Sequence, residues 1–338
     1  MNSGGLFIMQ RAAFALFSVT MPSRIPEISK VRQLIPPLSG ELHKGQAGRV
    51  GVIGGSEDYT GAPYFSAISA MKLGADLCHV FCEPGAGTVI KTYSPELIVH
   101  PYMRTSDKSY TSVSDIVSRV TSTFSRLHVL VVGPGLSRDT AMQDSAREIM
   151  LKAREKNMAI VVDADGLFLV QQHPETVKDY DKAVLTPNVV EFKRLCECMN
   201  INAKEHEQDT LAAQLSKAFG GVTIVQKGKV DLISNGKEVL RCETEGGLRR
   251  VGGQGDILSG TLGTFLAWGK LYEDGTWDHG NEVDPKDIAM LAAWGACSIT
   301  RDSSRRAFQK YGRAMLTSHM LEEIGAAYDK LAGDQSKI

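Results

Sequence analysis

Apolar and polar positions alternate in blocks along the chain from residue 50 onward. Short apolar runs bounded by glycine, proline or polar residues predict strands, and stretches with apolar residues at helical spacing predict helices between them. The expected strands are 50–53, 77–81, 97–99, 127–132, 159–162, 183–185 and 222–226, followed by a hairpin of 230–234 with 238–242. The expected helices are 63–73, 113–124, 139–156, 189–198, 256–268, 286–300 and 314–331.

Several of the expected strands are continuous apolar runs. A strand with one solvated face alternates apolar and polar residues, whereas a strand buried on both faces of a parallel sheet is apolar throughout. Regular alternation of strand and helix is typical of doubly wound folds. The sequence therefore predicts an α/β fold with a doubly wound, mostly parallel central sheet flanked by helices.

The pattern divides the chain into a leader and one domain. No internal repeat or low-complexity linker interrupts residues 25–332, so a single domain is the simplest interpretation, with a polar surface insertion at 274–287. Residues 1–24 hold no acidic residue, two arginines (Arg11 and Arg24) and an apolar run over 12–19. This composition is compatible with a mitochondrial transit peptide and equally with a leader that has no function. Met21 offers an internal start that would remove most of the leader.

Composition excludes several classes of protein. With 338 residues and 43% hydrophobic content the chain can bury a large core. A net charge of -1 argues against a broad nucleic-acid-binding surface. No apolar run approaches the ~20 residues that cross a bilayer. The six cysteines lie mostly within apolar segments and lack zinc-ligand spacing, which favours reduced thiols in a cytoplasmic compartment.

The strongest candidate for a functional site is the glycine-rich stretch 246–260, which is followed by an apolar helical pattern. Glycines there allow a sharp turn, and unobstructed N–H groups at a helix N-terminus form an anion site. Asp256, the one carboxylate of the stretch, could take a proton from a hydroxyl while those amides hold charge on a transferring phosphoryl group. The alternative is an ordinary glycine turn with Asp256 as helix cap.

Other glycine and polar residues follow expected strands directly. They are Gly54-Gly55-Ser56, Gly133-Pro134-Gly135, Asp163, Asn188 and Lys227-Gly228. In open α/β sheets, ligands bind at the carboxyl ends of the strands, so these residues together predict a site. The chain has no G-x-G-x-x-G dinucleotide fingerprint after an early strand and no Walker loop. A nucleotide would therefore be bound by a different motif.

Several of these motifs resemble the motifs of known enzyme families. Gly253-Gln254-Gly255-Asp256 resembles the G-x-G-D signature of ribokinase-like kinases, and Asn188-Val189-Val190-Glu191 resembles their N-x-x-E motif. More narrowly, the chain from about 30 to 325 resembles the eukaryotic ATP-dependent NAD(P)H-hydrate dehydratases. The stretches that carry this narrower resemblance are 54–56 with 59–63, 133–136, 163–166, 186–195, 226–228 and 252–260. Ser137 departs from the family, which often has glycine there.

The resemblance implies a ribokinase-like catalytic domain, a substrate and a set of roles. The substrate would be NADH or NADPH hydrated at C6 of the nicotinamide ring, ATP would phosphorylate the C6 hydroxyl, and phosphate would then leave. Asp256 would be the base, with the amides of Gly253 to Gly255 as anion hole. Glu191 would support Mg²⁺, which neutralises phosphate charge during transfer. A separate epimerase would supply the S-epimer.

The same resemblance implies two sets of binding residues. For the hydrate they are Gly135, Asn188, Val189, Val190, Glu191, Phe192, Lys193, Arg194 and Asp256. For ATP they are Lys227, Gly228, Lys229, Val230, Asp231, Gly246, Gly247, Leu248, Arg249, Arg250, Val251, Gly252, Gly253, Gln254 and Gly255.

Several of these residues have a structural alternative. Asn188 and Glu191 lie one helical turn apart and could form a capping box. Lys227 could be a solvated turn lysine, Arg249 and Arg250 a surface pair, and Asp163 a structural acid at a strand end.

Two other functions compete with the dehydratase. One is a small-molecule kinase of the thiazole or pyridoxal type, which would release a stable phosphorylated product. The other is a nucleotide-binding module without catalysis. The glycine turn with its carboxylate argues against the binding module, and the stretches 59–63 and 188–195 favour the dehydratase over the kinase.

Overall fold

A computed structural model describes residues 23–108, 111–202 and 208–333. Of the expected leader, residues 1–24, all but the last two lie outside the described residues. The first strand, β1 (Ser23–Arg24), is paired with β10, so the sheet begins two residues before the predicted boundary at 25.

One ten-stranded sheet runs through the described residues, in the order β1-β10-β9-β8-β7-β6-β5-β2-β3-β4. Its remaining strands are β2 (Arg49–Ile53), β3 (Leu77–Phe81), β4 (Ile98–His100), β5 (Val129–Val132), β6 (Ala159–Val162), β7 (Ala183–Leu185), β8 (Thr223–Gln226), β9 (Asp231–Ser234) and β10 (Val239–Cys242). Only β9 runs against its neighbours, in the predicted hairpin with β10. The predicted α/β class and mostly parallel sheet are confirmed.

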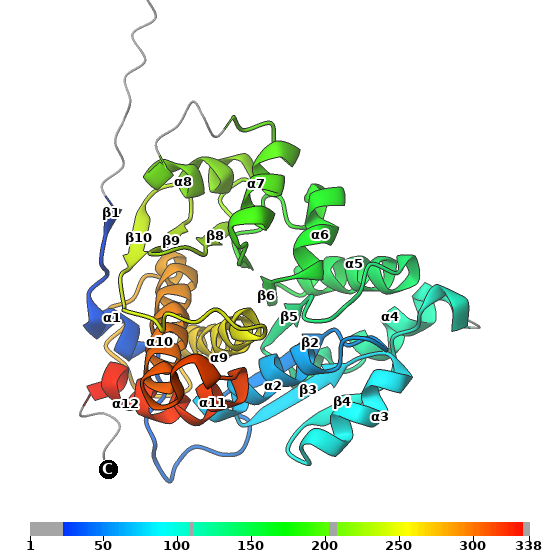
Figure 1. Cartoon of the computed structure of the whole chain (residues 1–338), viewed down its shortest axis with the longest axis horizontal. Coiled ribbons are helices and arrows are strands. Elements are labelled where there is room, and N and C mark those ends of the chain that lie inside the picture. Colours follow the sequence, from blue (N-terminus) through cyan, green and yellow to red (C-terminus); the bar gives the residue numbers. More distant parts are fainter. Residues whose placement is uncertain (1–22, 109–110, 203–207, 334–338) are drawn as a thin grey trace, which may run out of the picture.

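Helices cover both faces of the sheet (Figure 1). One face carries α1 (Ile28–Gln33), α2 (Gly61–Leu73), α9 (Gln254–Glu273), α10 (Ile288–Tyr311), α11 (Thr317–Glu322) and α12 (Ile324–Ala332). The opposite face carries α4 (Val113–Thr121), α5 (Thr140–Glu155), α6 (Asp165–Gln172), α7 (Val189–Cys198) and α8 (Gln208–Ala218), and α3 (Pro84–Tyr93) flanks the β4 edge.

The strands are apolar throughout because each one feeds two cores. Successive residues of a strand point to opposite faces of the sheet. Val129 and Val131 of β5 therefore join the cluster under α2, α9 and α10. Leu130 and Val132 join the cluster under α4 to α8. The double coverage explains the absence of alternation in these strands.

Helix α9 lies at the centre of the first core and packs closely on α2. A Cβ on Gly260 would lie 1.9 Å from the carbonyl oxygen of Ser66, so only glycine permits this approach. The contact holds the N-terminus of α9 at the carboxyl edge of the sheet. The predicted helix 256–268 is thus the first part of a longer helix, whereas the predicted helix 314–331 is divided into α11 and α12.

Candidate active site

The glycine-rich stretch forms the turn into α9. Gly253 is the residue before the helix, with φ of 97°, a conformation that glycine adopts without strain. Thr317 of α11 packs against this turn: its hydroxyl donates to the carbonyl of Gly252. By helix geometry, the N–H groups of Gln254, Gly255 and Asp256 have no carbonyl one turn earlier to bind. The turn therefore presents backbone donors at the positive end of a helix, as an anion site requires.

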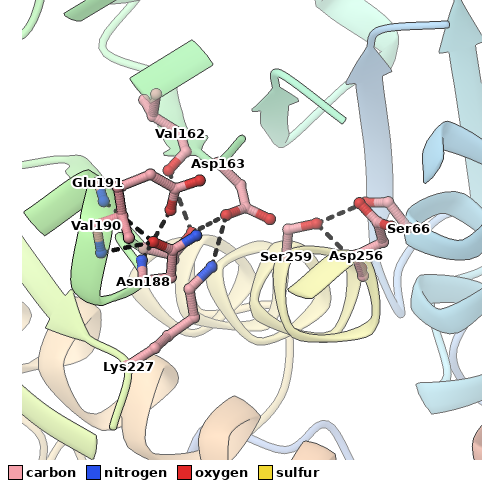
Figure 2. A network of polar contacts seen from close by, with 10 residues as sticks. Ser66, Val162, Asp163, Asn188, Val190, Glu191, Lys227, Asp256 and Ser259 are labelled. Atoms are coloured by element: carbon pink, nitrogen blue, oxygen red, sulfur yellow. Dashed lines mark hydrogen bonds and ion pairs between the residues drawn. The ribbon is translucent and has the colours of Figure 1, made fainter. Parts of the chain in front are cut away.

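Asp256 lies in the first turn of α9, partly buried. Burial and, to a lesser extent, the negative charge of Asp163 raise the pKa of its carboxyl group to about 8, against the opposing charge of Lys227. Its backbone carbonyl accepts from the Ser259 hydroxyl at 3.0 Å, and Ser259 in turn contacts Ser66 of α2 (Figure 2). The carboxylate therefore sits on a fixed turn and titrates close to neutral pH, where a general base is most effective.

An ion pair between buried Asp163 and half-buried Lys227 faces the same turn. Lys227, after β8, places Nζ 3.0 Å from Oδ1 of Asp163, which follows β6, and Thr186 donates to the same oxygen at 2.8 Å. Burial lowers the pKa of the Lys227 ammonium. The carboxylates of Asp163 and Glu191 raise it by more, so the pKa lies above its ordinary value. A Cβ on Gly255 would lie 3.5 Å from both Lys227 Nζ and Asp163 Oδ2, so this cation borders the anion site.

Asn188 and Glu191 form the capping box that the spacing allowed. The Asn188 side chain accepts from the N–H groups of Val190 and Glu191 at 2.9 and 3.0 Å, and Glu191 Oε2 accepts from the Asn188 N–H at 2.7 Å (Figure 2). Both residues also line the cavity described below. Burial raises the pKa of Glu191, and Lys227 lowers it. Asn188 and Glu191 therefore cap α7 and also line the cavity.

The loop after β8 is held by an arginine from α10. Arg301 pairs with Asp231 at 3.0 Å and donates to the carbonyl oxygens of Thr244, Gly228 and Lys229. Asp231 also accepts from the Gly228 N–H at 2.9 Å. These contacts join the loop 227–231 to the segment that leads into the glycine-rich turn.

These residues surround a cavity of about 740 Å³, within the range of cavities that hold small-molecule ligands. It lies beyond the carboxyl ends of β6, β7 and β8 and the N-terminus of α9. Of the predicted site residues, it is lined by Asn188, Val189, Glu191, Lys227, Gly228, Lys229, Asp231, Gly246, Arg250, Val251, Gly252, Gly253, Gln254, Gly255 and Asp256.

The other predicted site residues do not line this cavity. Phe192 is buried in the core, and Lys193 pairs with Glu197 on the surface of α7. Leu248 and Val190 are exposed, and Arg194 lines a neighbouring cavity. The remaining predicted residues that do not line the cavity are Gly135, Val230, Gly247 and Arg249.

Some lining residues had no role assigned from the sequence. Asp163 was expected at this edge of the sheet, and the structure places it in the cavity wall, paired with Lys227. The others are Ala164, Leu258, Cys297, Thr300, Arg301, Ser304 and Met320. Most of them belong to helices whose sequence pattern reports only on the core, so no local signal identifies them.

Two of the expected glycine turns have a packing role. A Cβ on Gly54 would lie 2.0 Å from the Pro134 carbonyl oxygen, and one on Gly133 would lie 1.8 Å from that of Asp163. These glycines let the loops after β2, β5 and β6 close on one another. They support the edge of the site without lining the cavity.

The carboxylates suit a metal that arrives with phosphates. In the described part of the chain, no group of three or more His, Cys, Asp or Glu side chains could hold a metal. Mg²⁺ usually binds through one or two carboxylates together with substrate phosphates and waters. Among the described residues, neither Oε1 of Glu191 nor Oδ2 of Asp163 takes part in a hydrogen bond, which fits that mode of binding.

Comparisons with solved structures agree with the fold. A ribokinase-like superfamily protein from Enterococcus faecalis matches with a TM-score of 0.71 at 20% identity, covering 92% of this chain and 96% of that one. An ADP/ATP-dependent NAD(P)H-hydrate dehydratase from Bacillus subtilis, co-crystallised with ATP/Mg²⁺, matches with a TM-score of 0.66 at 19% identity, covering 92% and 99%.

Comparisons with curated proteins are much closer in sequence. The ATP-dependent (S)-NAD(P)H-hydrate dehydratase of Phaeosphaeria nodorum is 50% identical over 92% of this chain and 96% of its own length. The rat protein of the same name is 49% identical over 89% and 84%. A family model described as NAD(P)H-hydrate dehydratase matches residues 50–326. The chain therefore belongs to the NAD(P)H-hydrate dehydratase family.

Proposed function

We propose that this protein is an ATP-dependent dehydratase that returns the S-epimer of hydrated NADH and NADPH to NADH and NADPH, releasing ADP and phosphate. The observation that carries the proposal is the position of Asp256. It lies in the first turn of α9, next to backbone donors and the Lys227 ammonium, at a cavity of about 740 Å³. Family membership supports the substrate and the cosubstrate.

The first step would be phosphoryl transfer. Asp256 would take the proton of the C6 hydroxyl, whose oxygen forms a bond to the γ-phosphorus of ATP while the bond to the β,γ-bridging oxygen breaks. The N–H groups at the start of α9 and the Lys227 ammonium would hold the charge on the moving phosphoryl group. Glu191 would bind Mg²⁺ together with the phosphates, and the metal neutralises phosphate charge.

The second step would be elimination. The ring nitrogen lone pair would expel phosphate from C6, and the released phosphate would take the proton from C5, which restores the double bond. Phosphate is a good leaving group, so this step does not require a second acid.

The proposal includes the placement of the two substrates. ATP would lie along the loop 227–231 and the stretch 246–255, which form one wall of the cavity with Arg301. The hydrate would lie toward Asn188, Glu191 and Gly135. An enzyme specific for the S-epimer would depend on a separate epimerase for the R-epimer.

Stoichiometry tests the function. Incubation with ATP, Mg²⁺ and NADH hydrate should yield ADP, free phosphate and NADH in equal amounts, with NADH followed by dihydronicotinamide absorbance. Accumulation of a stable phosphorylated compound without free phosphate would instead identify a kinase. Thiazole and pyridoxal alcohols serve as controls and should give little phosphorylated product.

For location we propose the cytosol, with entry into mitochondria through the leader. All six cysteines are free, in keeping with a reducing compartment. None of the helices in the described part of the chain has the length and apolar character of a membrane span. A reporter fused to residues 1–24 should enter mitochondria, and one that begins at Met21 should not. Cytosolic retention of the first reporter would show that the leader does not target.

A further inference from the structure

A second, smaller cavity of about 130 Å³ adjoins the first. It lies between the loop after β5, helix α6 and helix α7. Ala164 and Glu191 belong to the walls of both cavities. The side cavity is therefore next to the main one, on the side of Ala164 and Glu191. The remaining lining residues are Arg138, Asp165, Leu167, Phe168, Gln171 and Arg194.

Arg138 is held in place over this side cavity. Its guanidinium lies 4.4 Å above the centre of the Phe168 ring, a cation–π contact that orients the planar group. Its Nε is 3.7 Å from Oδ1 of Asp165, a long ion pair in which the side chain of Arg138 remains 58% exposed. The Nη groups are thus not used by this pair and are available to another acceptor.

Arg194 supplies a second guanidinium from α7. Within the described residues it forms no ion pair, in contrast to its neighbour Lys193, which pairs with Glu197. The two carboxylates of the side cavity are already bound to backbone donors: Asp165 accepts from the Ser137 N–H at 2.9 Å, and Glu191 from that of Asn188. Asp165 is shared between the Ser137 N–H and Arg138, so Arg194 is the guanidinium of this cavity that has no carboxylate partner among the described residues.

Such a cavity matches a phosphate group in size and chemistry. At about 130 Å³ it is well below the range of roughly 300–1,000 Å³ that encloses a whole small-molecule ligand. Guanidinium groups bind phosphate oxygens through two parallel hydrogen bonds, which fix orientation as well as charge.

We propose that Arg138 and Arg194 bind a phosphate group of the dinucleotide hydrate in this side cavity. The proposal rests on the proposed function, because that function supplies the dinucleotide. The substrate carries phosphate at two positions, and either could bind in the side cavity. The pyrophosphate bridge is common to both hydrates, and the 2′-phosphate is present only in the NADPH form. Arg138 then joins Arg194, which the resemblance already implies for the hydrate, as a substrate-binding residue, and the second assignment would also make both determinants of cofactor preference.

Kinetics of single variants distinguish the two phosphates. For Arg138→Gln and Arg194→Gln we expect KM for the hydrate to rise about tenfold or more, as for a lost charge-assisted hydrogen bond, with kcat within about twofold. A rise with both hydrates assigns the pyrophosphate, and a rise with NADPH hydrate alone assigns the 2′-phosphate. Arg138→Lys, which keeps the charge without the planar fork, should lie between wild type and Arg138→Gln.

The matched control is Arg147→Gln, which removes an arginine paired with Glu175 on α5, away from both cavities. Its KM values should equal those of the wild type. Unchanged KM for both hydrates in Arg138→Gln and Arg194→Gln, or a loss confined to kcat, would overturn the proposal.

A binding measurement separates this proposal from the dehydratase assignment. Calorimetric titration with NADPH and with NADH requires no turnover. Weaker binding to the two glutamine variants than to Arg147→Gln supports the side cavity even if the wild-type protein fails to dehydrate the hydrate. Equal binding by all variants, together with normal dehydration, rejects the side cavity and leaves the function standing.

Discussion

Asp256 combines two properties that a general base needs, a fixed position and a pKa near working pH. If it accepts the proton of the C6 hydroxyl, Asp256→Asn should lower turnover by about 100-fold or more, because general-base contributions are of this order. ATP binding should persist, since the backbone donors of the turn remain. Single-turnover rates and ATP titrations of the variant measure both effects. Turnover close to wild type would remove Asp256 from the mechanism.

Asp163 should control the pH at which Asp256 works. Burial is the main reason that the pKa of Asp256 is raised to about 8, and the charge of Asp163 is part of the same shift. A base acts when deprotonated, so kcat/KM of the wild type should rise with pH and level off above about 8. In Asp163→Asn the negative neighbour is gone and Lys227 is left without its partner, and both changes lower the pKa of Asp256.

The expected result for Asp163→Asn is a pH profile whose midpoint lies below that of the wild type, whatever the change in maximal rate. A residue with a merely structural role would lower the rate without moving the midpoint. Asp144→Asn, on the exposed side of α5, is the control and should keep the wild-type midpoint. An unshifted midpoint in Asp163→Asn would contradict the proposed coupling.

Ser137 has a backbone conformation that favours glycine, the residue that the resemblance leads us to expect there. Its φ of 71° lies in the left-handed region, where a non-glycine residue costs about 1–2 kcal/mol. Ser137→Val, with a branched Cβ, should therefore be less stable than Ser137→Gly by about this amount. Thermal or urea unfolding of the pair measures the difference. Equal stabilities would show that the loop relaxes out of this conformation.

At the scale of elements, the position of the active-site turn depends on the contact of α9 with α2. Gly260→Ala places a methyl group against the Ser66 carbonyl, and overpacking of this kind costs about 1–3 kcal/mol. The displaced helix should also weaken ATP binding. Gly325→Ala is the control: that glycine lies exposed in α12 with nothing within 4 Å of the added Cβ. It should be neutral or slightly stabilising.

Elements with a strong local pattern were predictable from the sequence. The core strands were found because burial on two faces leaves apolar runs, and α7 was found within its observed bounds. Helix α3 was missed because it begins Pro-Gly-Ala-Gly, a sequence typical of turns. Its Gly87 is explained by tertiary packing, since an added Cβ would lie 3.2 Å from Cys82 Sγ. Such a requirement is invisible in a local window.

The residues of the site divide in the same way, into those that a local sequence motif identifies and those that the fold brings in from elsewhere. The turn 252–256 and the Asn188–Glu191 pair could be recognised because their residues are adjacent in sequence. Arg301 reaches the cavity from α10 and looks ordinary within that helix, whereas Asp163 could be placed at the sheet edge but its pairing with Lys227 could not be predicted. Which side chains converge is decided by strand order, and the sequence predicts the class of sheet without predicting that order.

At the scale of the whole molecule, the carboxylate proposed as the base should reduce stability at alkaline pH. The folded pKa of Asp256 is about 8, against 3.8 as the ordinary value. Between these values the native state holds a proton that the unfolded state has lost, so the free energy of unfolding falls as pH rises. Above about 8 the difference is complete and the contribution levels off.

Asp256→Asn removes this dependence, because the amide is neutral at every pH. The variant should gain stability relative to the wild type as pH rises from about 4 to 8, while it loses turnover throughout. Thermal unfolding of both proteins at pH 5 and pH 9 measures the gain, and Asp144→Asn provides the baseline for a lost surface charge. A difference in melting temperature that is the same at both pH values would mean that Asp256 is ionised at low cost in the folded protein. In that case its carboxylate would be a weaker base than the site requires, and the activity profile should then show no rise toward pH 8.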